Sequence, residues 1–166
     1  MFVSRHSAAR YLVMLIIALS TASLMPSQTL AARACPMAMY KRADLSLVGA
    51  SSNWHSLLRH YSVFVSYDDG GLAEGYSDAV VKLIANRWDH FGVFVNLSKR
   101  NPGFGRWALL HIDATTANQD LEKIMVNTAT CIRDARNGAS CRAVRKAAAD
   151  ALVESRQILS GSRSPT

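Results

Sequence analysis

The sequence of 166 residues lacks the motifs that identify common enzyme classes. Its glycine pairs, Gly70-Gly71 and Gly103 with Gly105, have neither the spacing nor the lysine of a phosphate-binding loop. His55 and His60 stand five residues apart, whereas two histidines that share a metal ion on one helix stand three or four apart. No internal repeat is convincing. We therefore predict neither a metal ion nor a cofactor.

Long hydrophobic runs are also missing. The uninterrupted apolar run at residues 11–19 is well short of the ~20 residues that a membrane-spanning helix needs. Arg5 and Arg10 precede this run and small residues follow it, which is the layout of a secretory signal peptide. We assign residues 1–34 to this signal, with cleavage between residues 31 and 34, and expect a periplasmic or extracellular protein. The alternatives are a tether through an uncleaved N-terminal helix and a lipid anchor on Cys35.

Acidic residues are fewer than basic ones, 12 against 19, which gives a formal net charge of +7. Three of the arginines lie in the predicted signal, so the remaining chain carries about +4. This excess is mild, and we predict no nucleic-acid binding. Residues 35–166 are long enough for one domain with a single core.

The apolar spacing predicts an all-α fold, a single small domain of five to six amphipathic helices. Residues 35–53 show no clear period and are interpreted as a flexible or irregular lead-in, in which residues 44–48 form either a short strand or a helical turn. The helical domain covers residues 54–159. Residues 160–166 have the composition of a disordered tail.

Within the helical domain, three- and four-residue spacing of apolar side chains marks each helix. The first begins at Trp54, with Ser52 or Asn53 as its cap. Thr116 and Gln119 match a capping box at the start of a later helix. The expected helices cover about 54–65, 72–88, 91–97, 104–113, 116–132 and 140–159, and residues 93–95 remain compatible with a strand.

Cys131 and Cys141 bracket a polar turn between the last two predicted helices. If these helices pack antiparallel, the two cysteines lie within the distance that a disulfide spans. The redox alternative is disfavoured because redox motifs place their cysteines two residues apart. We predict a structural disulfide, which fits an exported protein. Cys35 is then left over, and is either free, lost with the signal or paired between molecules.

Basic residues surround this turn, and aromatic residues precede it. The basic group is interpreted either as a solvated helix end or as a docking patch for an acidic partner or a membrane headgroup surface. Tryptophans with a polar edge often anchor partners at an exposed rim. The candidate partner-binding residues are Arg133, Arg136, Arg142, Arg145, Lys146, Trp88 and Trp107.

Two functions are compatible with these patterns. The first is a non-catalytic binding or inhibitory module in a bacterial envelope, which binds another envelope protein. The alternative is a small hydrolase-like enzyme that uses His60 or His111 with a nearby carboxylate, for which Asp113 is one candidate. A cleft that brings one of these histidines within hydrogen-bond reach of a buried carboxylate favours the enzyme. Peripheral contact with a membrane is a third, weaker possibility.

Overall fold

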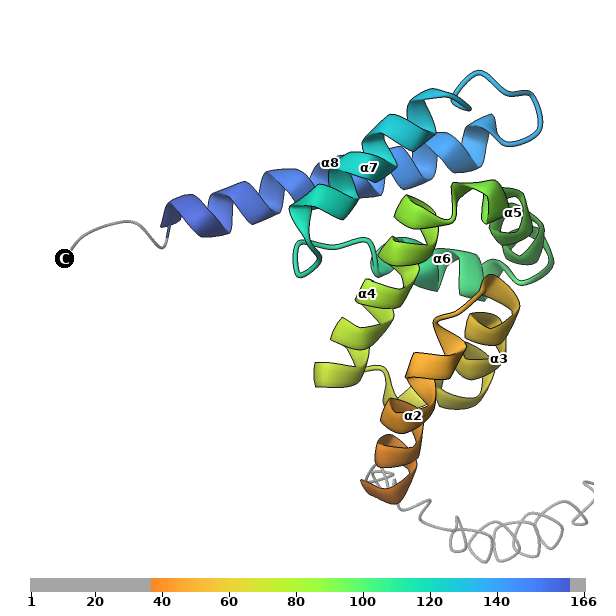
Figure 1. The fold of residues 1–166 in the computed structure, drawn as a ribbon, viewed down its shortest axis with the longest axis vertical. Helices are drawn as coiled ribbons and strands as arrows, with labels where there is room; N and C mark the ends of the chain where they lie inside the picture. Colours follow the sequence, from red (N-terminus) through yellow and green to blue (C-terminus); the bar gives the residue numbers. More distant parts are fainter. Residues whose placement is uncertain (1–36, 162–166) are drawn as a thin grey trace, which may run out of the picture. The chain divides into compact units, whose positions relative to one another are not determined.

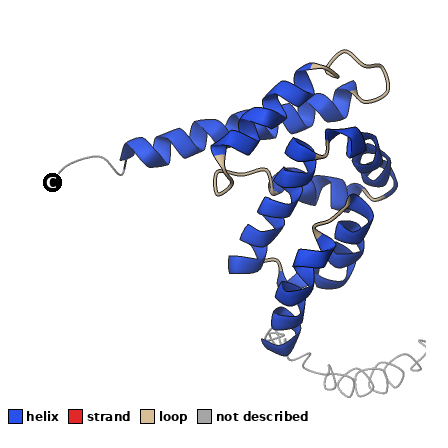
Figure 2. Cartoon of the chain, in the orientation of Figure 1, coloured by secondary structure: helices blue, strands red, loops and turns tan. Residues whose placement is uncertain are grey.

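The described part of the chain, residues 37–161 of a computed structural model, is built of helices and turns with no strand (Figures 1 and 2). It confirms the predicted all-α class. The predicted signal, Cys35 and residues 162–166 lie outside the described residues. The α-helices are α2 (Met37–Ala50), α3 (Trp54–Phe64), α4 (Gly70–Asn86), α5 (Phe91–Arg100), α6 (Pro102–Leu110), α7 (Asn118–Ala129) and α8 (Gly138–Gly161), with single 3-10 turns η1 (Val65–Tyr67) and η2 (Trp88–His90).

Helix α2 corrects the prediction of an irregular lead-in at residues 35–53. Its buried face consists of Ala43, Leu47 and Ala50, which are spaced four and three residues apart. Two of these three side chains are small, so the hydrophobic period is weak. The large apolar side chains of Leu45 and Val48 instead point to solvent. The physical reason for the error is that a helix can bury a face of alanines, which a search for large apolar residues does not detect.

Helix α4 lies at the centre of the core and contacts both α2 and α7. Its buried side chains include Leu72, Tyr76, Val80 and Ile84, which recur every four residues as the predicted helical spacing requires. Gly70, the first residue of α4, has a positive φ of 46°, a conformation that favours glycine. The turn before α4 reverses the chain after Asp68 and returns it through the core.

Helices α5 and α6 form a close pair that covers one side of α3. A Cβ atom built on Gly105 would lie 2.8 Å from Cβ of Ser98, so only glycine permits this approach. Trp54 and Phe104 are fully buried between these helices, and their ring centroids lie 6.3 Å apart. The predicted cap of α3 is Asn53, whose side chain accepts a hydrogen bond from the backbone N–H of Ser56 at 3.0 Å. Residues 93–95 belong to a helix and not to a strand.

Helices α7 and α8 pack along each other as an antiparallel hairpin (Figure 1). Cys131 and Cys141 form the predicted disulfide at its closed end, with Cα atoms 6.0 Å apart. The predicted capping box is wrong, because Thr116 donates its hydroxyl to the carbonyl of Asp113 and α7 begins after Ala117. Helix α8 continues to Gly161, so it includes the first two residues of the predicted tail. Within residues 37–161, no helix combines the length and apolar character needed to cross a membrane.

Candidate functional site

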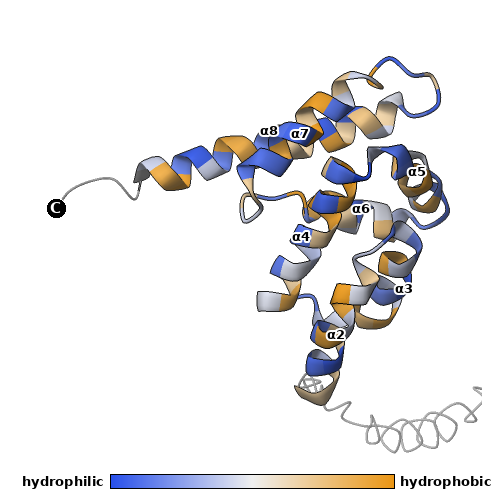
Figure 3. Cartoon of the chain, in the orientation of Figure 1, coloured by the Kyte–Doolittle hydropathy of each residue, from blue (hydrophilic) through white to orange (hydrophobic). Residues whose placement is uncertain are grey.

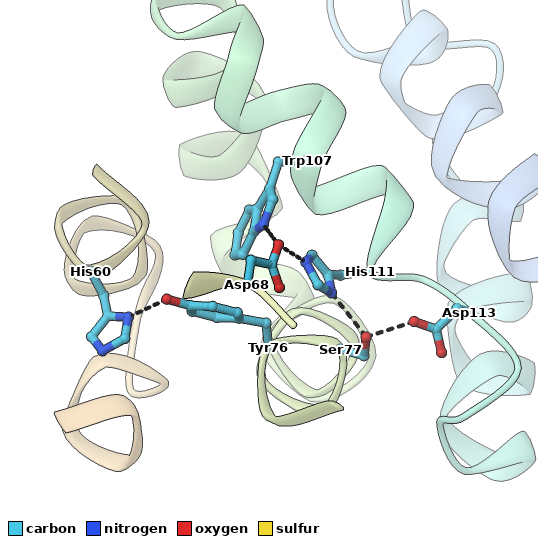
Figure 4. A network of polar contacts seen from close by, with 7 residues as sticks. All are labelled: His60, Asp68, Tyr76, Ser77, Trp107, His111 and Asp113. Carbon is cyan, nitrogen blue, oxygen red and sulfur yellow. Dashed lines mark hydrogen bonds and ion pairs between the residues drawn. The ribbon is translucent and has the colours of Figure 1, made fainter. Parts of the chain in front are cut away.

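A network of polar side chains runs through the core between α3, α4 and α6 (Figure 4). In its larger branch, Asp68 lies between Trp107 and His111, and His111 continues to Ser77 and Asp113. In its smaller branch, His60 contacts the hydroxyl of Tyr76. This network is the described region that most resembles catalytic machinery, because it joins a serine, a histidine and carboxylates.

Helix geometry aims Trp107 and His111 at the same carboxylate. They stand four residues apart, at the end of α6, and therefore lie on one face. Trp107 Nε1 donates to Asp68 Oδ2 at 2.6 Å, and His111 Nε2 lies 2.9 Å from the same oxygen. Asp68 reaches them from the turn that precedes α4.

The two ring nitrogens of His111 have different partners. Ser77 donates its one hydroxyl proton to Asp113 Oδ2 at 2.6 Å, so its Oγ accepts from His111 Nδ1 at 2.9 Å. A carboxylate only accepts, so His111 Nε2 also donates, to Asp68. Both ring nitrogens of His111 are thus engaged inside the protein, one with Ser77 and one with Asp68.

Asp68 holds a negative charge in a mostly buried position, and this charge acts on its neighbours. Burial raises the pKa of Tyr76 well above its usual range, and the charge of Asp68 raises it further. Tyr76 therefore stays protonated and donates its hydroxyl. The side chains of Asp68 and His111 are 16% and 10% exposed, so their ion pair is screened little by solvent.

His60 makes a different set of contacts. Its Nε2 lies 3.0 Å from the carbonyl oxygen of Ala43, which only accepts, so Nε2 carries the ring proton. Its Nδ1 then accepts from the hydroxyl of Tyr76 at 2.8 Å. Burial lowers the pKa of His60, against the opposing effect of the Ala43 carbonyl. His60 is thus a neutral link between α2, α3 and α4, and not a surface histidine.

The network has the residue types of a serine hydrolase, but its serine and histidine are buried. Ser77 is 2% exposed and His111 is 8% exposed, so neither side chain is open to a reactant. Ser77 gives its proton to Asp113, whereas a nucleophilic serine gives it to the histidine. Asp113 also accepts the backbone N–H and the hydroxyl of Thr115. These contacts hold the chain after α6 against α4.

The residues of the predicted basic cluster differ in their contacts: three have partners within the chain and two are exposed. Arg142 Nη1 donates to the carbonyl of Ile132 at 3.0 Å, and Arg145 donates to the carbonyl of Met125. Both guanidinium groups therefore brace the hairpin. Lys146 pairs with Asp150 at 2.6 Å. Arg133 and Arg136 are exposed at the disulfide turn.

The two candidate tryptophans lie in different surroundings. Trp107 is 7% exposed, which corrects its assignment to an exposed rim. The reason is that its N–H has an internal partner in Asp68 and its ring packs against Tyr76, with centroids 4.9 Å apart. Trp88 is half-buried and stacks on Phe91 at 4.3 Å.

A groove of about 480 Å³ lies between the end of α6 and the exposed side of α8. Leu110, at 78% exposure, stands on one wall, and Asp113 joins this groove to the buried network. Sequence reasoning paired His111 with Asp113 but missed Ser77 and the groove. The four-residue spacing of Trp107 and His111 could have predicted that both side chains lie on one helix face and contact the same residue.

The described residues contain no group of three or more histidine, cysteine or acidic side chains placed to hold a metal ion. Comparison with protein families, with curated proteins and with solved structures finds no match to this chain. The geometry of residues 37–161 is therefore the basis for any functional conclusion.

Proposed function

We propose that the chain is a non-catalytic binding module, exported to a bacterial envelope, that docks a segment of another protein in the α6–α8 groove. The observation that carries this proposal is the contrast between a catalytic-type cluster that is closed to reactants and a groove that is open. Ser77 is 2% exposed, whereas Leu110 in the groove is 78% exposed. We infer an interaction site here because this exposed apolar side chain stands on the wall of a groove, beside Leu109 and Ile112.

The walls of the groove fit a helix with an apolar face. Leu109, Leu110 and Ile112 line it from the α6 side. On α8 a row of small side chains lines it, because Ala143, Ala147 and Ala151 follow each other at four-residue spacing, and charged side chains flank this row. Small side chains along one helix leave room for a second helix to approach closely.

The charges of the groove favour a basic partner. Its acids are Asp113, Asp150 and Glu154, and its one cation, Lys146, is paired with Asp150. Lysines or arginines on the flanks of a docked helix would complement the remaining charge. The occupant is therefore a basic amphipathic segment of another protein, bound as a helix in a groove.

The α8 surface extends this site beyond the groove. Ile158 is exposed and stands four residues after Glu154, on the same side of α8. Figure 3 shows apolar and polar segments alternating along the free end of α8. A docked helix of three to four turns, an ordinary length, can thus contact both the groove and this end.

Site-specific crosslinking tests the proposal. A photoreactive side chain at Leu110 should capture an envelope protein, and mass spectrometry should place the link in a segment with basic residues around an apolar helical face. The matched control is the same group at Val126, which is 70% exposed on α7 outside the groove. Equal crosslinking from both positions, or a link to an acidic segment, would count against the groove.

The competing function is the hydrolase. One observation favours it, since Asp68, His111 and Ser77 are joined by two contacts of 2.9 Å. A fluorophosphonate probe reacts with an activated serine, and Ser77→Ala is the matched control. We expect no labelling of the folded chain. Labelling that disappears in Ser77→Ala would establish the enzyme instead.

Export is supported by the disulfide, because such bonds persist in oxidising compartments. N-terminal sequencing of the secreted or periplasmic protein should find a start between residues 31 and 35. A protein that still begins at Met1 would show that the signal is not cleaved and would favour a tether through the N-terminal helix. The lipid anchor on Cys35 predicts a mass increase on that residue.

A further inference from the structure

A hollow of about 410 Å³ lies between α2 and α3, on elements that do not form the α6–α8 groove. Its lining includes two arginines and no acidic residue. Arg42 comes from α2 and Arg59 from α3. The hollow is thus a concave surface with two positive charges and no internal counterion.

The guanidinium groups of this hollow are available to a ligand. The Arg42 side chain makes no hydrogen bond or ion pair with any described residue, and Arg59 Nη2 donates only to Ser56 Oγ at 3.1 Å. In contrast, Arg142 and Arg145 of the C-terminal hairpin are committed to backbone carbonyls. Each of the two hollow arginines carries several free N–H donors.

A hydroxyl adds a neutral donor. Ser56 Oγ accepts from Arg59, and its own proton has no partner among the described residues. His60 adds no charge, because its one ring proton faces Ala43 and Ser46. His60 therefore closes the inner wall, and the arginines and Ser56 supply the donors.

This donor set fits a phosphate better than a carboxylate. One guanidinium fork satisfies both oxygens of a carboxylate, which leaves a second arginine without a role. A phosphate ester presents three free oxygens and up to two negative charges, which match two guanidinium groups from different helices and one hydroxyl. The chemistry of the hollow therefore points to a phosphate.

The rest of the hollow is shaped for an organic group. Ala50, Val63 and Phe64 supply apolar lining, and a Cβ atom built on Gly49 would meet no atom within 4 Å. The volume of about 410 Å³ is within the range of small-molecule sites and far exceeds a phosphate ion. We propose that this hollow binds the phosphate group of a phosphate ester, held by Arg42, Arg59 and Ser56.

The test uses the chain without its N-terminal 34 residues and the full chain side by side. Inorganic phosphate and glycerol phosphate are titrated at constant ionic strength, and binding is followed by NMR of the arginine side-chain N–H groups. We expect saturable shifts at Arg42 and Arg59. The double variant Arg42→Gln/Arg59→Gln should weaken binding about tenfold or more, since charge-assisted hydrogen bonds are lost.

Two further variants separate this site from general attraction of anions. Gly49→Leu fills the hollow without changing its charge and should also weaken binding of glycerol phosphate. Arg133→Gln/Arg136→Gln removes the same charge from the disulfide turn and should leave binding unchanged. Circular dichroism checks that every variant keeps its helix content. Equal weakening by both double variants, or no saturable shift, would overturn the proposal.

Vesicles identify the source of the phosphate. Vesicles of phosphatidylglycerol in phosphatidylcholine are compared with pure phosphatidylcholine vesicles by cosedimentation. Binding that requires phosphatidylglycerol and both arginines assigns the site to lipid headgroups. Binding of the soluble ester alone assigns it to a free phosphate ester. Since crosslinking from Leu110 reports on the other groove, failure of this site leaves the proposed function standing.

Discussion

The buried network around His111 and the α6–α8 groove differ in how their polar groups are used. In the network, the polar groups face other residues of the same chain: His111 contacts Asp68 and Ser77, and Ser77 donates its proton to Asp113. In the groove, Glu154 and the exposed Leu110 have solvent as their neighbour. Asp113 belongs to both regions. Residue types alone therefore do not identify a site, because the serine, histidine and carboxylates of the network are occupied by one another, whereas the side chains of the groove face solvent.

The largest stability effect should come from the centre of the network. Asp68→Ala removes the shared partner of Trp107 Nε1 and His111 Nε2 and leaves two buried polar groups unsatisfied. We expect a loss of about 3–5 kcal/mol in the free energy of unfolding, because each unsatisfied buried polar group costs about 1–3 kcal/mol and more where its partner is charged. Urea unfolding measures this. A change below about 1 kcal/mol would show that the network is not a structural element.

The disulfide should have the next largest effect, on the region that carries the groove. Replacing Cys131 and Cys141 with serine opens a loop whose two ends are ten positions apart in the sequence. The chain-entropy model predicts a loss of about 2.5–3 kcal/mol. Unfolding of the double variant, compared with the oxidised parent, measures it. Equal stability of the two proteins would mean that the disulfide does not stabilise the α7–α8 hairpin.

Ser77→Ala should have a smaller effect, because it removes one hydroxyl and leaves Asp113 and His111 Nδ1 without that partner. We expect a loss of about 1–3 kcal/mol, the range for an unsatisfied buried polar group. Crosslinking from Leu110 should be retained at temperatures where the variant is folded. Loss of crosslinking with unchanged stability would assign Ser77 a direct functional role.

His60 should make stability depend on pH. Burial lowers its pKa below the ordinary value of 6.5. The unfolded chain therefore binds a proton that the folded chain does not, and the free energy of unfolding falls as the pH drops below about 6.5. His60→Gln should flatten this part of the profile, which chemical unfolding at a series of pH values measures. An unchanged slope would exclude His60 as its cause.

The smallest stability effect should come from the groove. Leu110→Asp changes an exposed side chain, so we expect stability within about 0.5 kcal/mol of the parent. Partner binding should nevertheless be lost, because a charge replaces an apolar contact. Val126→Asp is the control, with the same change on exposed α7. If Leu110→Asp still binds the partner, the binding site lies outside the groove.

Much of the fold was predictable because its signals are local. The cap at Asn53 and the inward face of α4 follow from short-range spacing of polar and apolar residues. The disulfide followed from two cysteines at the ends of a short turn between helices. Helix α2 was missed because its buried face, centred on Ala43 and Ala50, carries little hydrophobic signal.

The network was not predictable because its members are distant in the sequence and polar residues show no period. Ser77 and His111 are 34 residues apart, and Asp68 and His111 are 43 residues apart. Only the packing of α4 against the chain after α6 brings them together. The same holds for the groove, whose acids and alanines on α8 look like an ordinary solvent-exposed face until α6 is placed beside them.

A structural network and a binding groove are separated by comparing His111→Gln with Leu110→Asp, two changes at neighbouring positions. Each variant is measured by urea unfolding and by partner crosslinking from a photoreactive group at Ile158, on the same side of α8. We predict that His111→Gln loses stability and keeps crosslinking while folded, and that Leu110→Asp keeps stability and loses crosslinking. The opposite pattern, in which His111→Gln keeps its stability and loses crosslinking, would refute the groove as the binding site and favour the enzyme.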